Sequence, residues 1–262
     1  MTDRFAVDGT AVVTGASKGI GRAVAERFAA EGADVAICAR TEDEIEAAAA
    51  EITDTHDGNA AGVACDVRDR DGVDAVVETA VERFGGVDVL VNNAGASFVA
   101  GFEDISANGW QSIVDVNLTG TVNCTQAAAD HLKESGADGT ASSVVNVSSL
   151  AGVQGAPYMS HYGAAKAAIQ NLTRSLAAEW ADDGVRVNCV APGYVATPGV
   201  EAQMGISPGE VDRETVDRTV GTPEEVADIV QFLASDATSF VTGETVTARG
   251  VPEIEETPRT GP

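Results

Sequence analysis

Lysine is nearly absent from this chain: only Lys18, Lys133 and Lys166 occur among 262 residues. The 16 basic residues are far outnumbered by 41 acidic ones, and the formal net charge is −25. A surface this acidic repels nucleic acids and anionic membranes, so both are poor candidates for partners. It also repels itself unless salt screens the charges, and the screening length falls to about 3 Å at 1 M ionic strength. The composition resembles that of halophilic proteins, which work in a salt-rich cytoplasm.

Cysteine is also sparse, and Cys38, Cys65, Cys124 and Cys189 form neither a CxxC pair nor a cluster with histidine. We expect four reduced, mostly buried thiols, with no disulfide framework and no metal site. No apolar run is long enough to span a membrane. The polar start, Met1-Thr2-Asp3-Arg4, leads directly into the first predicted strand, which leaves no room for a signal peptide. We therefore expect a cytoplasmic protein.

Hydrophobic residues make up 44% of the chain, enough for a substantial core. Short apolar runs alternate with helical patterns, which predicts a parallel sheet covered by helices on both faces. The predicted strands are Thr10–Thr14, Asp34–Ala39, Ala60–Cys65, Val87–Val91, Ser142–Val147, Arg186–Ala191 and, more weakly, Thr245–Ala248. The predicted helices cover residues 19–31, 41–54, 70–84, 110–134, 159–181 and 223–234. We predict one doubly wound, Rossmann-type α/β domain over residues 1–262, with a seven-stranded parallel sheet.

Two stretches depart from this alternation. Residues 198–220 are rich in Gly, Pro, Glu and Asp and show no clear apolar stripe, so we expect a mobile substrate lid there. Residues 251–262 carry three prolines and several acids, which predicts an extended tail.

A glycine-rich turn, Thr14-Gly15-Ala16-Ser17-Lys18-Gly19-Ile20-Gly21, joins the first predicted strand to the first helix. Glycines allow a tight turn and a close approach of the backbone to phosphate, and the helix beyond presents free N–H groups to an anion. The alternative is an ordinary turn between a strand and a helix, since short glycine patterns are weak signals. The position after the first strand favours phosphate binding.

Tyr162 and Lys166 lie four positions apart in a predicted helix, so their side chains share one face. An ammonium group near a phenol is expected to lower the tyrosine pKa from about 10, which suits a general acid/base. The alternative is a surface lysine beside a packed tyrosine. The scarcity of lysine argues against it, as does Ser149 at the end of a strand, where ligands bind in such folds.

Together these segments resemble the short-chain dehydrogenase/reductase family, in its 3-oxoacyl reductase-like branch. The matching segments, in order, are the TGASKGIG turn, Asn92-Asn93-Ala94-Gly95, Asn117, Ser148-Ser149, Tyr162-Gly163-Ala164-Ala165-Lys166, and Pro192-Gly193 with Thr197. The resemblance spans about residues 8–248. It implies an oxidoreductase that transfers a hydride between a nicotinamide cofactor and a carbonyl or secondary alcohol, and a homotetramer.

The resemblance assigns the catalytic roles. Tyr162 gives a proton to the substrate oxygen in reduction and removes one in oxidation, while Ser149 polarises that oxygen. Lys166 tunes Tyr162 and holds the nicotinamide ribose, and Asn117 anchors a water that leads protons to solvent. Ser148 is the alternative to Ser149, but the spacing of thirteen residues to Tyr162 favours Ser149. His161 is interpreted as the rim of the substrate pocket or as packing.

The resemblance also assigns the cofactor contacts. They are Gly15, Ser17, Lys18, Gly19, Ile20 and Gly21 of the turn, Arg40, Asp66 and Val67 near the adenosine, Asn93, Ala94 and Gly95 on its ribose side, and Tyr162, Lys166, Pro192, Gly193, Val195 and Thr197 near the nicotinamide.

NADP(H) is favoured over NAD(H) by the end of the second strand. Members that prefer NAD usually carry an acid there, whereas this chain has Ala39, followed by Arg40. Arg40 and Lys18 match positions where NADP-preferring members place cations for the 2′-phosphate. The alternatives are that Arg40 faces solvent and Lys18 faces the pyrophosphate.

The substrate walls are expected at residues 96–101, 150–158 and 194–220, which suit a modest, partly apolar carbonyl or alcohol. A 3-oxoacyl thioester, a sugar or sugar acid, and a simple ketone are all candidates. The resemblance slightly favours the thioester, whereas the absence of a basic cluster for a CoA phosphate counts against it.

Other functions are kept as alternatives: an NAD(H)-dependent sugar or alcohol dehydrogenase, a non-catalytic dinucleotide-binding regulator, and an epimerase or dehydratase. The last strand also departs from the family, which often ends it in an Asp-Gly-Gly type sequence where this chain reads Arg249-Gly250-Val251.

Overall fold

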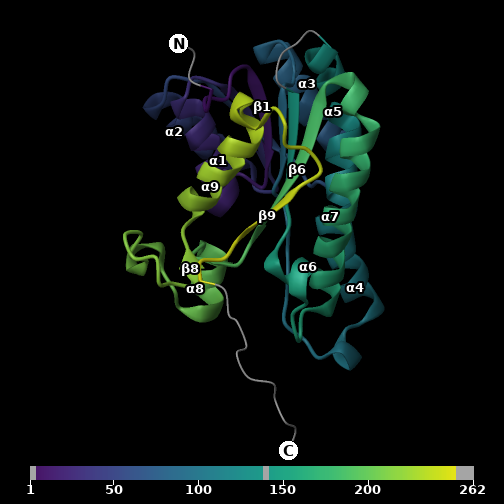
Figure 1. Ribbon diagram of the computed structural model, residues 1–262, viewed down its shortest axis with the longest axis vertical. Helices are drawn as coiled ribbons and strands as arrows, with labels where there is room; N and C mark the ends of the chain where they lie inside the picture. Colours follow the sequence, from purple (N-terminus) through teal and green to yellow (C-terminus); the bar gives the residue numbers. More distant parts are fainter. Residues whose placement is uncertain (1–3, 138–141, 252–262) are drawn as a thin grey trace, which may run out of the picture.

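The computed structural model describes residues 4–137 and 142–251, and the structural statements below refer to these residues (Figure 1). Seven parallel strands form one sheet in the order β3-β2-β1-β4-β5-β6-β9. The strands are β1 (Thr10–Thr14), β2 (Asp34–Ala39), β3 (Ala60–Ala64), β4 (Val89–Asn92), β5 (Ser142–Val147), β6 (Val185–Pro192) and β9 (Thr245–Ala248). The predicted doubly wound α/β fold is confirmed.

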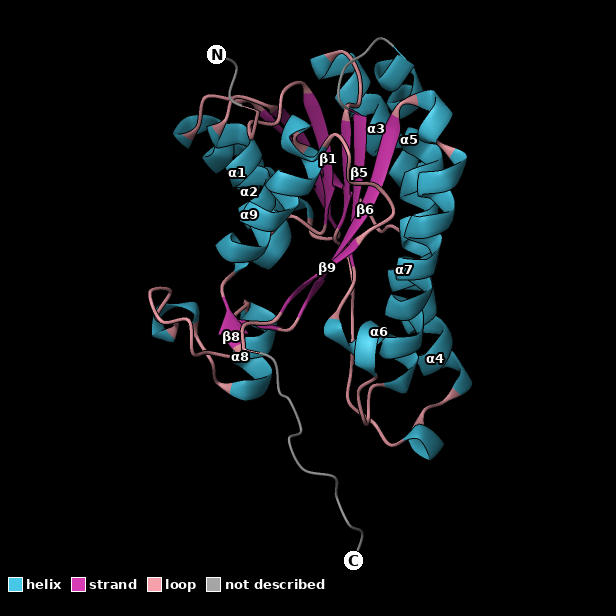
Figure 2. Ribbon diagram, in the orientation of Figure 1, coloured by secondary structure: helices cyan, strands magenta, loops and turns pink. Residues whose placement is uncertain are grey.

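Helices cover both faces of this sheet (Figure 2). One layer consists of α1 (Gly19–Ala30), α2 (Glu42–Thr55) and α9 (Pro223–Ala234). The other consists of α3 (Arg70–Phe84), α5 (Gly120–Ala137) and α7 (Ser160–Glu179). Because each face is covered, all residues of β1 and β5 are buried, which explains why the strands lack an alternating polar pattern.

Two hydrophobic clusters hold the layers together. Phe28 of α1 and Leu233 of α9 belong to the first cluster, and Leu90 and Leu132 belong to the second. Arg27 of α1 also forms an ion pair with Asp228 of α9. The first and last long helices of the described chain therefore pack against each other.

The predicted helix over residues 110–134 differs from the structure. It begins earlier, as α4 (Ala107–Val114), where the Ser106 side chain accepts a hydrogen bond from Gly109 N at 3.0 Å. It then passes through a π-helical turn, η2 (Asp115–Thr119), before it continues as α5. A single extra residue in one turn hardly changes the apolar spacing, so the sequence pattern does not reveal it.

The segment predicted as a lid contains more regular structure than its composition suggested. Thr197 caps α8 (Pro198–Met204), with a proline in the first turn, and η4 (Pro208–Glu210) follows. Two short parallel strands, β7 (Tyr194–Val195) and β8 (Val220–Gly221), close the base of this segment. Of the predicted tail, residues 252–262 lie outside the described residues.

The other short elements are α6 (Leu150–Gln154), η1 (Phe102–Asp104), η3 (Ala181–Asp183) and η5 (Asp236–Thr238). No helix within residues 4–137 and 142–251 is long and apolar enough to cross a bilayer. All seven strands of the main sheet run parallel, so their carboxyl ends meet at one edge, where ligands bind in doubly wound folds.

Candidate active site

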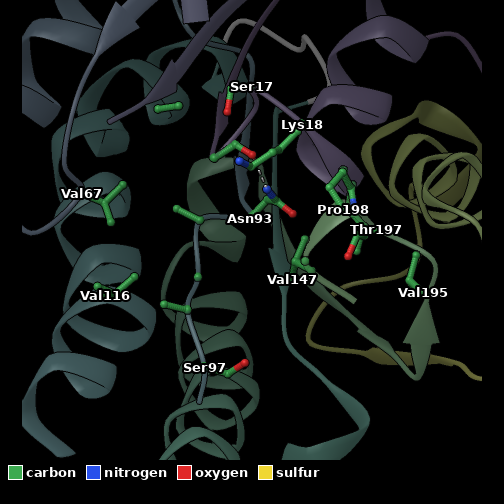
Figure 3. Close-up of a pocket in the computed structure, with 18 of the residues that line it drawn as sticks. Ser17, Lys18, Val67, Asn93, Ser97, Val116, Val147, Val195, Thr197 and Pro198 are labelled. Atoms are coloured by element: carbon green, nitrogen blue, oxygen red, sulfur yellow. Dashed lines mark hydrogen bonds between the residues drawn. The ribbon is translucent and has the colours of Figure 1, made fainter. Parts of the chain in front are cut away.

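A cavity of about 590 Å³ opens at the carboxyl edge of the sheet, within the size range of ligand pockets (Figure 3). Figure 3 shows Val67 and Val116 on one side of it and Thr197 and Pro198 on the other. Every residue predicted to contact the cofactor lines this cavity except Gly21, and so do Ser149, Tyr162 and Lys166. Thus residues from distant parts of the sequence meet at one site.

Gly21 serves the turn rather than the cavity surface. A Cβ atom at this position would lie 2.5 Å from the carbonyl oxygen of Gly15, too close for any side chain. Gly15 and Gly19 have φ values of +66° and +62°, in the left-handed region that favours glycine. The side chain of Lys18, at the N-cap of α1, makes no capping hydrogen bond, so the first N–H groups of this helix face the cavity without a side-chain cap.

Asn93 braces the glycine-rich turn. Its side-chain nitrogen donates to the carbonyl oxygens of Thr14 at 2.8 Å and Gly15 at 3.1 Å. The backbone N–H groups of Asn93 and Ala94 both donate to the Thr14 hydroxyl at 3.0 Å. Asn93 lines the cavity as predicted, but its amide nitrogen positions the turn, a role the sequence analysis missed.

The end of the cavity that is expected to take the adenosine has two exposed cations. Lys18 and Arg40 line the cavity and form no ion pair among residues 4–137 and 142–251. Asp66 also lines it, but its carboxylate pairs with Arg68 at 2.5 Å, and this hydrogen bond lowers the Asp66 pKa. Glu44 is a further acidic group at this end that the sequence analysis did not name.

Ser149, rather than Ser148, faces Tyr162. The Ser149 hydroxyl is hydrogen-bonded to the Tyr162 side chain and accepts a bond from Ala151 N at the start of α6. The Ser148 hydroxyl is instead buried, donating to the carbonyl oxygen of Lys166 at 2.8 Å and accepting from Gln170 at 2.9 Å. Of the two serines, the half-buried Ser149 is therefore the one that faces Tyr162, while the Ser148 hydroxyl is bonded within the core.

Lys166 is 3% exposed, and its Nζ atom donates to the carbonyl oxygen of Val147 at 2.8 Å. Burial lowers the pKa of Lys166 to about 8, because the charged form loses its hydration. Burial also raises the pKa of Tyr162, while the hydrogen bond from Ser149 opposes this shift. The expectation that Lys166 lowers the tyrosine pKa is thus wrong in direction for the chain alone, because burial dominates.

Asn117 lies on the π-helical turn η2, fully buried beside the cavity. Its side-chain nitrogen donates to the carbonyl oxygens of Ala96 at 2.8 Å and Ile113 at 2.9 Å. Its Oδ1 atom has no hydrogen-bond partner within the described part of the chain. A Cβ atom on Gly95 would lie 2.8 Å from that oxygen and 3.4 Å from Lys166 Nζ, so both atoms border the same small space.

A buried polar network that the sequence analysis did not identify supports the strand ends. The side-chain nitrogen of Asn92 donates to Thr125 at 3.0 Å and to Asn146 at 2.9 Å, and Asn146 donates to Thr173 at 2.9 Å. These bonds tie β4 and β5 to α5 and α7, the helix that carries Tyr162. Such networks fix one arrangement of a core.

His161 contributes packing. It is completely buried, its ring lies 4.2 Å from that of Phe98 between centroids, and burial lowers its pKa. Neither ring nitrogen has a hydrogen-bond partner in the described ranges. Of the two interpretations from sequence, packing therefore fits.

These residues suit a nicotinamide dinucleotide. The glycine-rich turn leaves room for a backbone approach to phosphate, and unpaired cations lie at one end of the cavity. At the other end, Tyr162 and Lys166 line the cavity, and the unsatisfied oxygen of Asn117 lies behind its wall at Gly95. All four cysteines are buried and free, and no group of three or more potential metal ligands occurs within residues 4–137 and 142–251.

Comparisons with known proteins agree with this site. The sequence profile of the family described as Enoyl-(Acyl carrier protein) reductase matches residues 15–250. The chain is 41% identical over 250 residues to the short-chain reductase protein NovJ of Streptomyces niveus, covering 93% of each chain. It is 36% identical over 247 residues to a 3-oxoacyl-[acyl-carrier-protein] reductase of Synechocystis sp., covering 92% of this chain and 95% of the other.

A comparison with a solved structure also points to a reductase fold. The L-sorbose reductase of Gluconobacter frateurii, complexed with NADPH and L-sorbose, superimposes with a TM-score of 0.83 at 30% identity, covering 95% of this chain and 98% of the other. The fold, the cavity and these matches over most of the chain agree. The chain belongs to the short-chain dehydrogenase/reductase family and is an NAD(P)-dependent oxidoreductase that acts on alcohols and carbonyls.

Proposed function

We propose that the protein is an NADP(H)-preferring reductase of a small carbonyl substrate, with Tyr162 as its general acid/base. The observation that carries this proposal is the group formed by Tyr162, its hydrogen-bonded neighbour Ser149 and the buried Lys166 in the wall of one cavity. When bound, the reduced nicotinamide supplies the hydride. Tyr162 donates its phenolic proton to the substrate oxygen, so that a carbonyl becomes a secondary alcohol.

The raised pKa of Tyr162 suits the reductive direction, because the phenol keeps its proton at neutral pH. Ser149 donates a hydrogen bond to the same substrate oxygen and stabilises the charge that develops there. Lys166 holds a positive charge near the phenol as the proton leaves. The unpartnered Oδ1 of Asn117 is placed to hold a water molecule that returns a proton from solvent through Lys166.

NADP(H) is preferred in this proposal because of the charges at the adenosine end. Ala39 lines the cavity where an acid would accept hydrogen bonds from the ribose, and Arg40 and Lys18 supply positive charge for a 2′-phosphate. The L-sorbose reductase structure is complexed with NADPH, which supports the same preference. An NAD(H)-dependent sugar or alcohol dehydrogenase is the second candidate, and Glu44 in the cavity wall favours it.

Three further features belong to the proposal. The similarity to a 3-oxoacyl-[acyl-carrier-protein] reductase supports assignment to that branch. Residues 198–220 act as a lid, since Pro198, Gly199 and Val200 line the cavity while the rest of the segment extends away from it. A homotetramer is proposed from family resemblance, and Phe232 and Phe240, 41% and 102% exposed, offer apolar surface for subunit contacts.

The test is a panel of carbonyls and alcohols assayed with NADPH, NADH and their oxidised forms in high-salt buffer. We expect turnover with NADPH, and a loss of about 10²- to 10⁴-fold in kcat in Tyr162→Phe with unchanged dinucleotide affinity. Ser175→Ala is the control, because Ser175 lies on the same helix as Tyr162, is exposed and does not line the cavity. Near-normal turnover by Tyr162→Phe would overturn the assignment.

A further inference from the structure

Arg249 lies where the last strand leaves the sheet, at the position where the sequence departs from the family pattern. A Cβ atom added to Gly193 would lie only 3.1 Å from the Cβ atom of Arg249, so the backbones of these two residues are in close contact. From there the side chain reaches α6, where Nη1 donates to Oε1 of Gln154 at 3.3 Å. The guanidinium thus bridges the end of β9 and the helix that follows Ser149.

This position borders the cavity wall near Gly193 and Ser149. Gly193 lines the cavity, and α6 begins directly after Ser149, whose hydroxyl is bonded to Tyr162. Gln154 is five residues beyond Ser149, and five helical residues rise about 7.5 Å. Arg249 and Gln154 do not line the cavity itself, so a substrate held by Ser149 and Tyr162 meets them only with a second polar group that extends towards the end of α6.

The guanidinium of Arg249 has no acidic partner in the part of the chain that the structure describes. Of the fifteen lysines and arginines in residues 4–137 and 142–251, seven form an ion pair with a carboxylate. Arg22, Arg27, Arg68, Arg70, Arg213 and Arg218 all form ion pairs. Arg249 forms none within residues 4–137 and 142–251, and its neutral partner Gln154 occupies only one of its five N–H groups.

We propose that Arg249 and Gln154 bind a carboxylate on the substrate, which makes the substrate an oxo acid or hydroxy acid. This inference rests on the proposed function of the site. A planar guanidinium binds carboxylate through two parallel hydrogen bonds, and the amide of Gln154 can add a third. The local cation also offsets the repulsion that a net charge of −25 exerts on an anionic substrate.

The experiment compares ketones that differ only in charge. The probes are 4-oxopentanoate, 5-oxohexanoate and 6-oxoheptanoate, each paired with its methyl ester, assayed with saturating NADPH. We expect the wild-type enzyme to prefer at least one acid over its ester in kcat/KM. Arg249→Gln should lower kcat/KM for that acid by about 10- to 100-fold and leave the ester nearly unchanged.

Two further variants distinguish recognition of the substrate carboxylate from the effect of a changed net charge. Gln154→Glu places a carboxylate beside Arg249 and should abolish the preference for acids while Arg249 is still present. Arg83→Gln is the matched control, because Arg83 is an exposed arginine on α3 without an ion pair, so its loss changes the net charge equally. This control should keep the wild-type ratio of acid to ester.

Binding provides a measure that does not need turnover. Calorimetry with the enzyme–NADP⁺ complex should show tighter binding of hexanoate than of hexanamide, and Arg249→Gln should remove the difference. An equal affinity for both, or a preference for acid that survives Arg249→Gln, overturns this inference but leaves the reductase assignment intact. Failure of the wild-type protein to bind either dinucleotide would instead overturn the proposed function.

Discussion

The Nζ atom of Lys166 lies 5.7 Å from the centre of the Tyr162 ring, in a site where both side chains have lost most of their water. Burial acts in opposite directions on the two groups, since it favours a neutral lysine and a protonated phenol. At neutral pH the phenol therefore keeps its proton, whereas Lys166, with a pKa of about 8, still carries its charge. Burying that charge opposes folding, which has consequences for stability.

Replacing Lys166 should stabilise the protein in a pH-dependent way. The unfolded lysine titrates near 10.4 and the folded one near 8, so the unfolded state binds more protons between these values and raising the pH stabilises the native wild type. Below about pH 8 the cost of burying the charge is fully present. Lys166→Met should therefore raise Tm by several degrees at pH 7, and this advantage should shrink towards pH 10.

The measurement is best made by calorimetry in the Tyr162→Phe background, so that the phenol does not titrate. Lys133→Met is the control, because Lys133 is partly exposed and pairs with Asp183 at 2.8 Å. Its effect on Tm should be independent of pH across the same range. A Lys166→Met difference that is flat with pH would contradict the assignment of a depressed lysine pKa.

A single acid at the end of β2 should reverse the choice of cofactor. Ala39→Asp places a carboxylate beside Arg40 in the cavity wall, where it repels a 2′-phosphate and can accept hydrogen bonds from ribose hydroxyls. We expect kcat/KM for NADPH to fall by about tenfold or more, with NADH unchanged or improved. Ala64→Asp adds the same charge at the position paired with Ala39 on β3, outside the cavity, and should leave the ratio unchanged.

The base of the proposed lid, residues 198–220, is linked to α9 by an ion pair between Arg218 and Glu225, in which Nη1 and Oε2 lie 2.7 Å apart. Arg218→Met should raise KM for the carbonyl substrate several-fold and lower Tm by a few degrees, because the pair is partly buried and Arg218 also donates to the carbonyl oxygens of Thr215 and Val220. Arg70→Met removes the exposed pair with Asp74 on α3 and serves as the control. Unchanged KM and unchanged proteolysis of residues 198–220 would argue against a lid.

The same ion pair should resist acid. Hydrogen bonds from Arg218 lower the pKa of Glu225 to about 2, below its ordinary value of 4.5. A depressed carboxyl pKa contributes stability that is complete above the ordinary value and is lost only as the pH falls towards the folded one. Limited proteolysis should therefore find the lid equally protected at pH 7 and pH 5.

Salt should stabilise the fold if the acidic surface is an adaptation to a salt-rich cytoplasm. Tm should rise by several degrees between about 0.1 M and 2 M KCl, because screening reduces repulsion among surface carboxylates. Sucrose at matched osmolality controls for general exclusion effects. No gain in Tm from KCl over sucrose would contradict the halophilic hypothesis.

Fold and site were predictable from sequence to different extents. The bounds of β1, β2, β5 and β9 match the predicted strands, because buried parallel strands are continuous apolar runs with glycine and acidic boundaries. The π-helical turn at Asn117 was not predictable, since hydrophobic spacing tolerates one additional residue. Helix α8 was missed because its seven residues are too few to show an apolar stripe.

The motif positions correctly predicted many of the residues that line the cavity, but not which hydrogen bonds their side chains make or how their pKa values shift. Asn93 was expected to face the cofactor, yet its amide nitrogen is hydrogen-bonded to the turn that it braces. The pKa of Tyr162 was expected to fall because a lysine lies one turn away, whereas burial of both side chains decides the direction. The burial of a residue depends on which other parts of the chain pack around it, and the spacing of residues in the sequence does not predict this.

The packing of α1 against α9 constrains how the chain is made. Helix α1 is complete by Ala30, but its covering helix begins only at Pro223. During synthesis α1 can pack against β1, β2 and α2, but the side of it that contacts α9 has no native partner until nearly the whole polypeptide has left the ribosome. A nascent chain stalled before that point exposes apolar surface on α1, so completion of this layer depends on completion of translation.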